Sequence, residues 1–322
     1  MRPDHTQRPS LRTLFERALA RRVRAAIGVS ASPVEVWSLE GTELWVKRDD
    51  LNAAICGGNK ARALQYLLGA APAGARLVTV GGEGSTHVLA TAIHGATLGH
   101  QTHAFRWRHA MNPVAHRVSA AIGERCAAAP ILPATALAFA AAAWRRGVRG
   151  DHWIPFGGTS PLGMTGHVEA AIELADQVAA GALPPPERVF VALGTGGTAA
   201  GLALGFAVAG LPTTVVAVRC GPSLGHEAMW LRRLGARAAD HLDLPHGLPR
   251  RMQVTVDHGA YSGAYGRPLS AARELADQLV TERGVLLDDT YAAKACYAAA
   301  RARAAAGGPV LFWHTFDARW MR

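Results

Sequence analysis

The feature that most constrains the fold is the regular alternation of short β-rich runs with longer alanine-rich runs of helical period. The expected strands are residues 44–47, 76–80, 102–107, 188–193, 213–219, 252–256, 284–287 and 310–313. The expected helices are residues 11–27, 59–68, 86–98, 113–122, 163–180, 198–208, 268–280 and 290–305. Strands that alternate with helices in this order predict an α/β fold with mostly parallel sheets flanked by helices.

The composition narrows the class of protein. Its 322 residues, 49% of them hydrophobic, are enough for one large or two modest domains. The formal charge of +10 comes from scattered arginines rather than a basic stripe, so we expect no nucleic-acid partner. The longest weakly polar run, residues 134–144, is too short to span a bilayer, so we expect no membrane-spanning segment.

Cysteine and histidine usage predicts a reduced protein without a metal. The four cysteines lie far apart and form no CxxC pair, which suits a reducing compartment. The 14 histidines show no HExxH or similar array, so no metal is expected. The N-terminus opens with polar residues such as Arg2 and Asp4 and lacks the apolar core of a secretory signal. We therefore expect a cytoplasmic protein.

Glycine clusters mark four of the predicted strand-to-helix switches. They are Gly57-Gly58, the run from Gly81 to Gly84, Gly157-Gly158 and the run from Gly194 to Gly197. Ligands bind at the ends of strands in open α/β sheets, and glycine lets backbone amides approach them closely. Four such loops predict one shared binding site.

The strongest local signal is the apolar strand 188–193, which runs into Gly194-Thr195-Gly196-Gly197-Thr198 and then into an alanine-rich helix. Free N–H groups and the positive end of the helix converge there, which suits a phosphate group. The same loop fits a relaxed dinucleotide fingerprint, Gly194-x-Gly196-x-x-Ala199, and the next strand ends at Arg219, where a 2′-phosphate would fit. An NADP-binding oxidoreductase is therefore an alternative.

Lys60 is the most unusual of the three lysines. It falls in the first turn of a predicted helix capped by Asn59, which is the unfavourable end for a cation. The positive end of the helix should lower its pKa, and a neutral amine is what attack on an aldehyde requires. The alternative is a solvated helix lysine. Lys47 is expected in an ion pair, and Lys294 is expected at the surface of its helix.

A third signal is the loop that ends in Ser85-Thr86-His87. Ser85 is predicted to be the N-cap of the following helix, where its hydroxyl and the next amides would hold a substrate carboxylate. Ordinary helix capping is the alternative explanation for a serine at this position.

Together these segments resemble the pyridoxal-phosphate enzymes of the 1-aminocyclopropane-1-carboxylate (ACC) deaminase and D-cysteine desulfhydrase family, which have the tryptophan-synthase-β-like fold. The likeness runs from about Pro33 to the C-terminus. The motifs that carry it are VKRDDL (46–51), GGNKxR (57–62), GG with SxH (81–87), IPxGG (154–158), GxxG (163–166), GTGGTxAGL (194–202), YxxxYGxP (261–268), LDxxYxxK (287–294) and HT (314–315).

The resemblance implies pyridoxal 5′-phosphate as the cofactor, with Lys60 as its Schiff-base lysine. It implies that Ser85 faces the substrate carboxylate and relays protons, while Tyr265 and Tyr291 line the substrate side. The residues expected to hold the cofactor, besides Lys60, are Asn59, Thr86, Gly194, Thr195, Gly196, Gly197, Thr198 and Thr315.

The sequence departs from the family pattern at several positions. A second lysine usual in the family is Ala63, and the asparagine expected to meet the ring hydroxyl is Thr86. The glutamate that pairs with the pyridine nitrogen in the deaminase is Ala292, and the usual His-Thr-Gly-Gly ending continues with Phe316-Asp317. Without that glutamate the ring is a poorer electron sink, which disfavours cyclopropane opening more than β-elimination. Thr315 would offer the nitrogen a neutral hydrogen bond, and Asp317 is a candidate for restoring a charge.

We therefore expect a two-lobed protein. Residues 1–60 and 159–322 would form the large cofactor-binding domain and residues 61–158 a smaller inserted α/β domain. The expected activity is that of a pyridoxal-phosphate-dependent lyase or deaminase that acts on a small amino acid, most simply by α,β-elimination to a 2-oxo acid and ammonia, as in D-cysteine desulfhydrase. A homodimer is the usual arrangement in the family. NADP-dependent oxidoreduction and a catalytically reduced homologue that still binds the cofactor are the alternatives.

Overall fold

The computed structural model describes residues 9–39, 41–222, 225–305 and 308–321. Residues 1–8, on which the expectation of a missing secretory signal depends, lie outside these ranges. No helix within the described ranges is long and apolar enough to cross a membrane. Four short 3-10 turns accompany the main elements: η1 (Asp49–Leu51), η2 (Phe156–Gly158), η3 (Leu248–Arg251) and η4 (Arg319–Met321).

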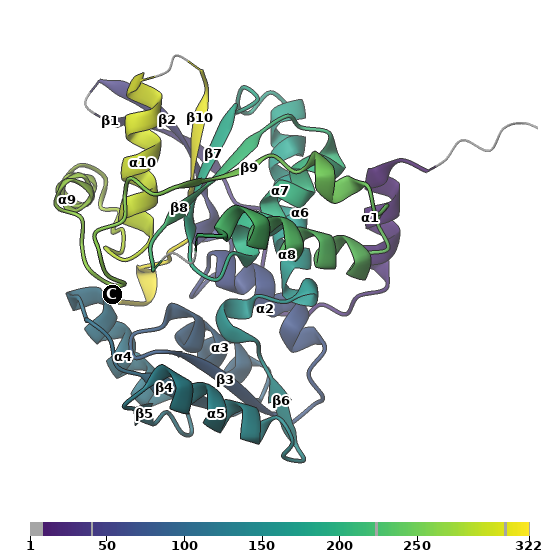
Figure 1. Ribbon diagram of the computed structural model, residues 1–322, viewed down its shortest axis with the longest axis vertical. Coiled ribbons are helices and arrows are strands. Elements are labelled where there is room, and N and C mark those ends of the chain that lie inside the picture. Colours follow the sequence, from purple (N-terminus) through teal and green to yellow (C-terminus); the bar gives the residue numbers. More distant parts are fainter. Residues whose placement is uncertain (1–8, 40, 223–224, 306–307, 322) are drawn as a thin grey trace, which may run out of the picture.

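The larger of two sheets has six strands (Figure 1). In spatial order they are β1 (Val34–Leu39), β2 (Thr42–Arg48), β10 (Val310–His314), β7 (Arg188–Leu193), β8 (Thr214–Arg219) and β9 (Val254–Asp257). Only the β1–β2 hairpin is antiparallel; the other pairs are parallel. The carboxyl ends of the parallel strands therefore share one edge of the sheet.

Helices cover both faces of this sheet, because successive strand residues point to opposite sides. Val189, Val191 and Leu193 of β7 pack with one set of helices, whereas Phe190 packs with the other set. The first set is α1 (Leu11–Ala20), α6 (Pro161–Ala179), α7 (Gly197–Ala209) and α8 (Glu227–His241). The second set is α9 (Ser270–Arg283) and α10 (Ala292–Ala305).

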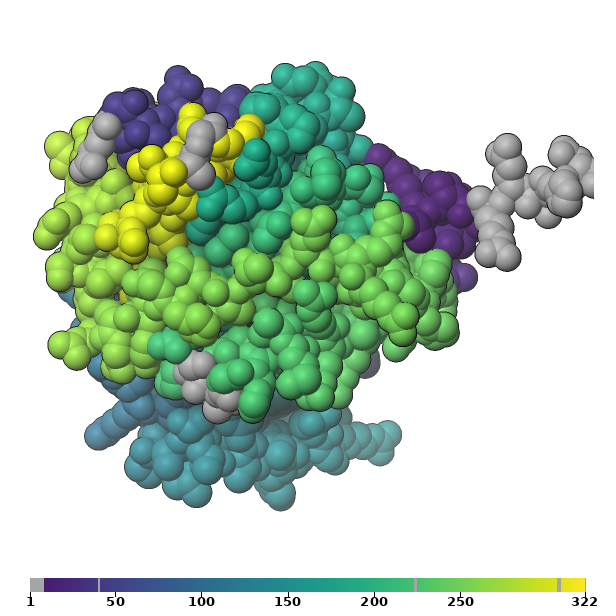
Figure 2. Space-filling model, turned by 45° about the horizontal axis from the view of Figure 1, so that its top comes forward, coloured from purple at the N-terminus to yellow at the C-terminus, as the bar shows by residue number. Residues whose placement is uncertain are grey.

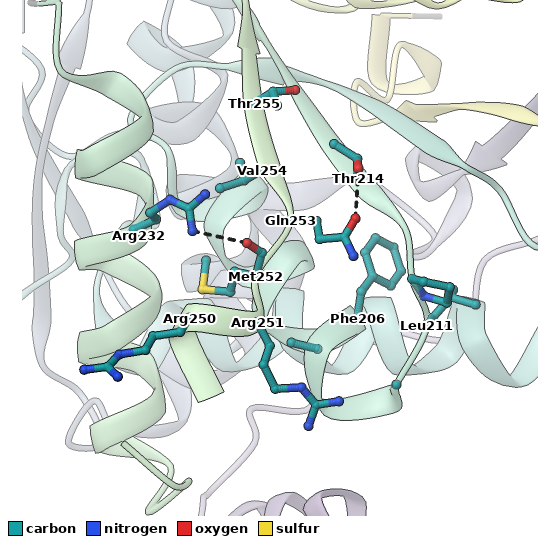
Figure 3. Close-up of a pocket in the computed structure, with 13 residues that line it drawn as sticks. Phe206, Leu211, Thr214, Arg232, Arg250, Arg251, Met252, Gln253, Val254 and Thr255 are labelled. Atoms are coloured by element: carbon teal, nitrogen blue, oxygen red, sulfur yellow. Dashed lines mark hydrogen bonds between the residues drawn. The ribbon is translucent and has the colours of Figure 1, made fainter. Parts of the chain in front are cut away.

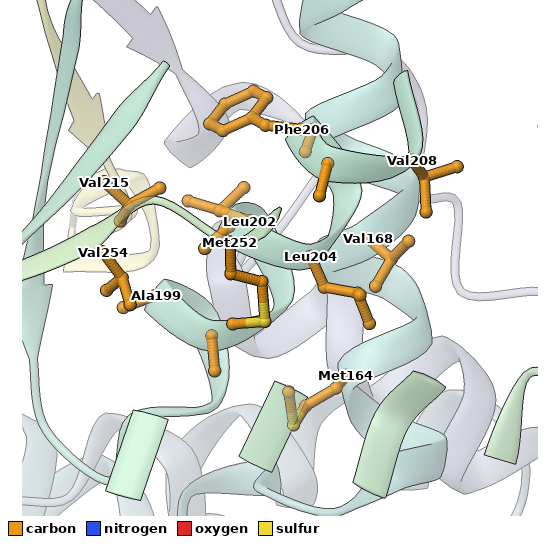
Figure 4. Packing of buried hydrophobic residues seen from close by; sticks show 14 of the residues in the cluster. Met164, Val168, Ala199, Leu202, Leu204, Phe206, Val208, Val215, Met252 and Val254 are labelled. Atoms are coloured by element: carbon orange, nitrogen blue, oxygen red, sulfur yellow. The ribbon is translucent and has the colours of Figure 1, made fainter. Parts of the chain in front are cut away.

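Helix α7 lies at the centre of the first face. It is apolar all round and buried from Gly197 to Val208, as expected for a helix with neighbours on every side. Figure 4 shows its side chains between those of α6 and those of the sheet. A Cβ on Gly201 would lie 2.5 Å from the Cβ of His167, so glycine is what allows α6 and α7 to approach this closely.

The smaller sheet has four parallel strands: β5 (Ile131–Leu132), β4 (Thr102–Trp107), β3 (Arg76–Gly82) and β6 (Asp151–Trp153). Helices α2 (Asn59–Gly69), α3 (Thr86–Thr97) and α4 (Pro113–Arg125) share one hydrophobic cluster with it, and α5 (Thr135–Arg145) shares another. We call residues 61–158 the small-sheet segment. Its strands and helices α3, α4 and α5 form the lower part of the molecule in Figure 1, and the segment lies in the lower part of Figure 2.

The predicted fold class is confirmed, but several predicted elements are wrong. Residues 284–287 form no strand, because Gly284 adopts the left-handed conformation that ends α9 and the chain then leads to α10 without a β partner. The predicted helix 11–27 ends at Ala20. Strands β1, β5 and β6 and helices α5 and α8 were not predicted.

Lys294 is also misassigned by the sequence, because it is fully buried rather than on the surface. It is one of the buried residues of α10, and its ammonium donates a hydrogen bond to Ser262 Oγ at 3.0 Å. Lys47 does form the expected ion pair; its partner is Glu173, at 2.5 Å.

A hollow of about 540 Å³ lies at the opposite edge of the large sheet from the glycine loop that follows β7 (Figure 3). Its walls come from the C-terminal end of α7, the first residues of β8 and β9, and three arginines, Arg232, Arg250 and Arg251. The starts and the ends of parallel strands lie at opposite edges, so this hollow is separate from the site described next.

Candidate active site

The loop Gly194–Thr198 joins β7 to α7 and forms a cradle of backbone donors. Gly196 is the N-cap of α7 in the left-handed conformation, with φ of 95°, and the first hydrogen bond of the helix runs from Ala200 N to Gly196 O at 3.0 Å. The amides of the first turn therefore lack partners within the helix. No side chain caps this end and no acidic residue lies in its first turn. The cradle suits a phosphate group.

A second glycine loop lies directly against this cradle. A Cβ on Gly157 would lie 2.6 Å from Thr195 Oγ1, and a Cβ on Gly197 would lie 2.6 Å from Thr159 Oγ1. The hydroxyls of Thr159 and Thr195 are hydrogen-bonded at 2.5 Å. Side chains larger than glycine would therefore push the two loops apart.

Lys60 reaches the second loop, because its Nζ donates a hydrogen bond to Gly157 O at 3.2 Å. Burial lowers the pKa of Lys60 to about 8. Among the ion pairs of the described residues, none includes this ammonium. An amine that is half-buried, without a carboxylate and with a lowered pKa, is suited to imine formation.

Asn59 contacts the cradle directly but does not cap the helix as predicted. Gly58 is the N-cap of α2, and Asn59 is its first helical residue. The Asn59 amide donates to Thr198 Oγ1 at 2.8 Å, which joins the start of α2 to the start of α7. The hydrogen bond between Asn59 and Thr198, which are 139 positions apart in the chain, thus fixes Lys60 beside the cradle.

Two buried histidines lie close enough to Lys60 for its charge to act on them: His87 of the SxH motif, and His167, which the sequence did not point to. Burial, and then the charge of Lys60, lowers the pKa of both His87 and His167 to about 3. Both imidazoles are therefore neutral at physiological pH. His87 has a fixed tautomer, because Thr79 donates to Ile154 O and accepts from His87 Nε2.

The C-terminal segment holds the loop that leads into Lys60. Gly58 has φ of 97°, and a Cβ there would collide with the carbonyl of Thr315. Gly57 N donates to Asp317 Oδ2 at 2.9 Å, and Arg319 also binds the Asp317 carboxylate. Thr315 therefore lies beside the start of α2, while the Asp317 carboxylate is engaged in these structural bonds.

Ser85 is the N-cap of α3, as predicted, and its hydroxyl oxygen accepts from Val88 N at 3.4 Å. The hydroxyl proton remains available for another acceptor. Thr86 is the first residue of α3, so its amide is among the donors without a helical partner. This end of α3 can hold an anion while Ser85 caps it.

Tyr265 and Tyr291 form a pair, with hydroxyl oxygens 2.9 Å apart. A Cβ on Gly194 would lie 3.4 Å from Tyr291 Cε1, so the pair adjoins the cradle. Burial raises the pKa of Tyr265 to about 12 and also raises the pKa of Tyr291 well above its ordinary value. Both phenols keep their protons at neutral pH and are hydrogen-bond donors rather than bases.

The arrangement fits pyridoxal phosphate. It combines an unpaired amine, a cradle for a phosphate and a second helix end for a carboxylate within one group of touching loops. Ala63, which stands where the family usually has a second lysine, is closely packed, since a Cβ on Gly158 would lie 3.0 Å from the Ala63 Cβ. Arg219, the residue proposed for a 2′-phosphate, stacks over the Tyr261 ring at 3.8 Å.

Comparisons with known proteins agree with this chemistry. A family model described as pyridoxal-phosphate dependent enzyme matches residues 31–315. The chain is 38% identical over 293 residues to nocardicin C-9′ epimerase of Nocardia uniformis subsp. tsuyamanensis, with 85% of this chain and 86% of the relative covered. It is 30% identical over 295 residues to D-cysteine desulfhydrase of Salmonella choleraesuis, with 85% and 87% covered. A crystal structure of an ACC deaminase homologue superposes with a TM-score of 0.79 at 26% identity and covers 96% of this chain and 95% of the other.

Proposed function

This chain belongs to the family of pyridoxal-phosphate-dependent enzymes, and from that premise we propose that it is a lyase or deaminase that converts a small amino acid into a 2-oxo acid and ammonia. Family membership makes pyridoxal phosphate the cofactor, so the NADP alternative is set aside. The single observation that carries the proposal is the position of the Lys60 amine, which is unpaired and one hydrogen bond from the loop that packs on the cradle.

When bound, pyridoxal phosphate supplies an aldehyde that condenses with amines and a ring that withdraws electrons from the substrate Cα. Lys60 is the amine that would hold it. When its Nζ is free, Lys60 would also be the base that takes the proton from the substrate Cα. Its pKa of about 8 keeps a useful neutral fraction near pH 7.5.

The two helix ends divide the anionic groups between them. The loop Gly194–Thr198 binds the cofactor phosphate, and Asn59 supports Thr198 from the side of α2. Ser85 and the first amides of α3 bind the substrate carboxylate. Thr86 and Thr315 complete the proposed cofactor contacts.

The tyrosine pair supplies a proton on the substrate side. The two hydroxyl oxygens are 2.9 Å apart, and in this proposal Tyr291 donates to the Tyr265 oxygen. Tyr265 then keeps its own proton for the departing group. In an α,β-elimination this proton neutralises a leaving thiolate or hydroxide.

Borohydride trapping tests the assignment of Lys60. The chain has only three lysines, at positions 47, 60 and 294, so peptide mapping after reduction identifies the labelled amine without ambiguity. We expect the label on Lys60, and loss of the label together with at least about a 100-fold drop in ammonia release for Lys60→Ala. A label on Lys47 or Lys294, or unchanged turnover by Lys60→Ala, would contradict the proposal. A labelled protein that neither releases ammonia from any D- or L-amino acid nor epimerises one would indicate the catalytically reduced homologue.

Epimerisation at Cα is a second candidate, because a relative that is 38% identical is named an epimerase. It needs the same proton removal by Lys60, followed by return of a proton to the opposite face instead of loss of a leaving group. Incubation of single enantiomers in D₂O separates the two activities. Elimination yields ammonia and a 2-oxo acid, whereas epimerisation yields the deuterated opposite enantiomer without ammonia.

We also propose that residues 61–158 act as a separate domain inserted between two parts of the cofactor-binding domain, and that the protein is a cytoplasmic homodimer. The free thiols of all four cysteines support a reducing compartment. The position of the small sheet, formed wholly within residues 61–158, supports the domain division. Light scattering after gel filtration measures the oligomeric state, and a monomer at micromolar concentration would contradict the dimer.

A further inference from the structure

Residues 109–112 lie between β4 and α4 in the small-sheet segment and touch the loop that carries Tyr265. The ring of His109 meets the Tyr265 ring edge-on, with centroids 4.9 Å apart and an interplanar angle of 69°. A Cβ on Gly266, whose φ is 78°, would lie 2.6 Å from Ala110 O. Two consecutive residues of the small-sheet segment thus contact two consecutive residues of the tyrosine loop.

Asn112 adds a buried hydrogen bond next to Tyr291. Its side-chain amide donates to Thr290 Oγ1 at 3.0 Å, and Thr290 directly precedes Tyr291 in the chain. Its amide oxygen accepts from Ala115 N at 2.8 Å, so Asn112 is at the same time the N-cap of α4. Asn112 is 5% exposed and Thr290 is 9% exposed. Both ends of the amide are therefore engaged, and the bond to Thr290 is shielded from water.

The same stretch also touches the loop that leads into α3. A Cβ on Gly82, the last residue of β3, would lie 2.7 Å from His109 Cδ2. The carbonyl of Trp107, two residues before His109, accepts a hydrogen bond from Glu83 N at 2.9 Å. Residues 109–112 therefore lie between the helix end proposed for the substrate carboxylate and the tyrosine pair proposed for the leaving group.

Packing and hydrogen bonds hold both sides of this contact. Val114, in the first turn of α4, packs against the hydrophobic cluster of α3 and α4 and also against that of α9 and α10. On the other side, the carboxylate of Asp288 accepts from the amides of Thr290, Tyr291 and Ala292. Three bonds thus hold residues 290–292 as one unit, so a bond at Thr290 also fixes Tyr291.

We propose that Asn112 is a positioning residue for the tyrosine pair, because its bond to Thr290 fixes the start of α10. Tyr291, the next residue, then holds the Tyr265 hydroxyl where its proton reaches the leaving group. The inference rests on the proposed function. In the net reaction Lys60 takes the Cα proton, the electrons of that bond form the Cα–Cβ double bond, and the bond from Cβ to the leaving group breaks. A leaving hydroxide takes the Tyr265 proton and departs as water, whereas chloride departs as an anion and needs no proton.

Variants on both sides of the bond test its role. Asn112→Ser keeps a hydroxyl that caps α4 but is too short to reach Thr290. Thr290→Val has nearly the shape of threonine but offers no acceptor, whereas Thr290→Ser keeps the hydroxyl and is the matched control. The double variant Asn112→Ser/Thr290→Val shows whether the two changes act through the same bond.

The substrates are serine, whose hydroxide needs a proton to leave, and β-chloroalanine, whose chloride does not, each as D and L forms. We expect Asn112→Ser and Thr290→Val to lower kcat for serine by at least about 10-fold and kcat for β-chloroalanine by less than about 3-fold, with little change in KM. The double variant should lose no more than the larger single loss, and Thr290→Ser should behave as wild type. Circular dichroism and cofactor content should match wild type in every variant.

The outcomes separate this inference from the proposed function. An equal loss for serine and β-chloroalanine, or no loss for either, overturns the role of Asn112, while ammonia release by the wild-type protein sustains the lyase. If serine yields no ammonia, amide hydrogen exchange decides the inference, and if no amino acid yields ammonia, the lyase is wrong as well. Exchange of residues 289–293 that is faster in Asn112→Ser and Thr290→Val than in Thr290→Ser would sustain the positioning bond, and equal exchange in all variants would overturn it.

Discussion

Replacement of Arg62 by methionine tests whether a buried ion-pair network fixes the helix that carries Lys60. Arg62 lies two residues after Lys60 on α2 and is 3% exposed. Its guanidinium binds Asp49 at 2.6 Å and Glu173 at 2.7 Å. After the substitution Glu173 keeps Lys47 at 2.5 Å, whereas Asp49 loses its only ion-pair partner among the described residues and keeps Ser32 Oγ at 3.1 Å.

The buried carboxylate of Asp49 therefore loses the positive charge that Arg62 provides. Removing one partner of a buried pair costs about 3–5 kcal/mol, and because Glu173 stays paired we expect the lower end, about 3 kcal/mol. The assay is equilibrium unfolding in urea, followed by tryptophan fluorescence and circular dichroism at pH 7.5. The control is Arg12→Met. Arg12 binds Asp176 with both side chains about half exposed, at 47% and 48%, so that loss should stay below about 1 kcal/mol.

The pH dependence gives a second readout with a defined sign. Burial alone would raise the pKa of Asp49, but Arg62 and then Lys47 bring it below the ordinary value. In wild type this pairing stabilises the fold above the unfolded pKa of about 4 and is lost as the pH falls through the lowered folded pKa. Without Arg62, burial dominates and the pKa rises, so the carboxyl can protonate at mildly acid pH.

The destabilisation by Arg62→Met should therefore be smaller at pH 5 than at pH 7.5. A free-energy change no larger than that of Arg12→Met, or one that grows as the pH falls, would refute the electrostatic reasoning. A variant with the expected loss of stability should also bind the cofactor more weakly, since α2 carries Lys60.

Two further substitutions probe the cradle and the tyrosine pair. Gly197→Ala places a Cβ 2.6 Å from Thr159 Oγ1 and should push the two loops apart. A fluorescence titration should then show a dissociation constant for the cofactor that is raised by about 10-fold or more, a change of about 1.4 kcal/mol. An unchanged constant would mean that the loops are not in contact. Tyr265→Phe should lower kcat by about 100-fold with little change in KM. Burial raises the pKa of Tyr265 to about 12, so the kcat of the wild-type enzyme should show no loss from ionisation of this phenol up to about pH 10.

The regular parts of this fold could be predicted from sequence because local pattern and burial agree there. In β7, β8 and β10 every second apolar residue faces one helical layer and the others face the second layer, so the runs are continuously apolar. Strands β5 and β6 have only two and three residues, too few for a pattern to develop. Residues 284–287 have the composition of a strand but pair with no strand, because they follow the left-handed Gly284 that ends α9.

The candidate site, like the fold, has parts that the local sequence predicts and parts that it does not. Its loops could be predicted because a glycine-rich run directly after an apolar strand is visible in the local sequence, as it is in the Gly194–Thr198 cradle. The burial of Lys294 and the contact of His109 with Tyr265 depend on elements distant in the chain, which no local pattern records.

The contact of the C-terminal segment with Gly57 and Gly58 has a consequence for how the protein is made. On the ribosome, the lysine-bearing loop emerges long before the residues that fix it, because Gly57 and its partner Asp317 are 260 positions apart and the carbonyl against Gly58 belongs to Thr315. The Lys60 loop therefore cannot take its final shape until the segment with Thr315 and Asp317 has been made. Until then a nascent chain carries an unshaped loop, and cofactor capture has to follow the docking of that distant segment.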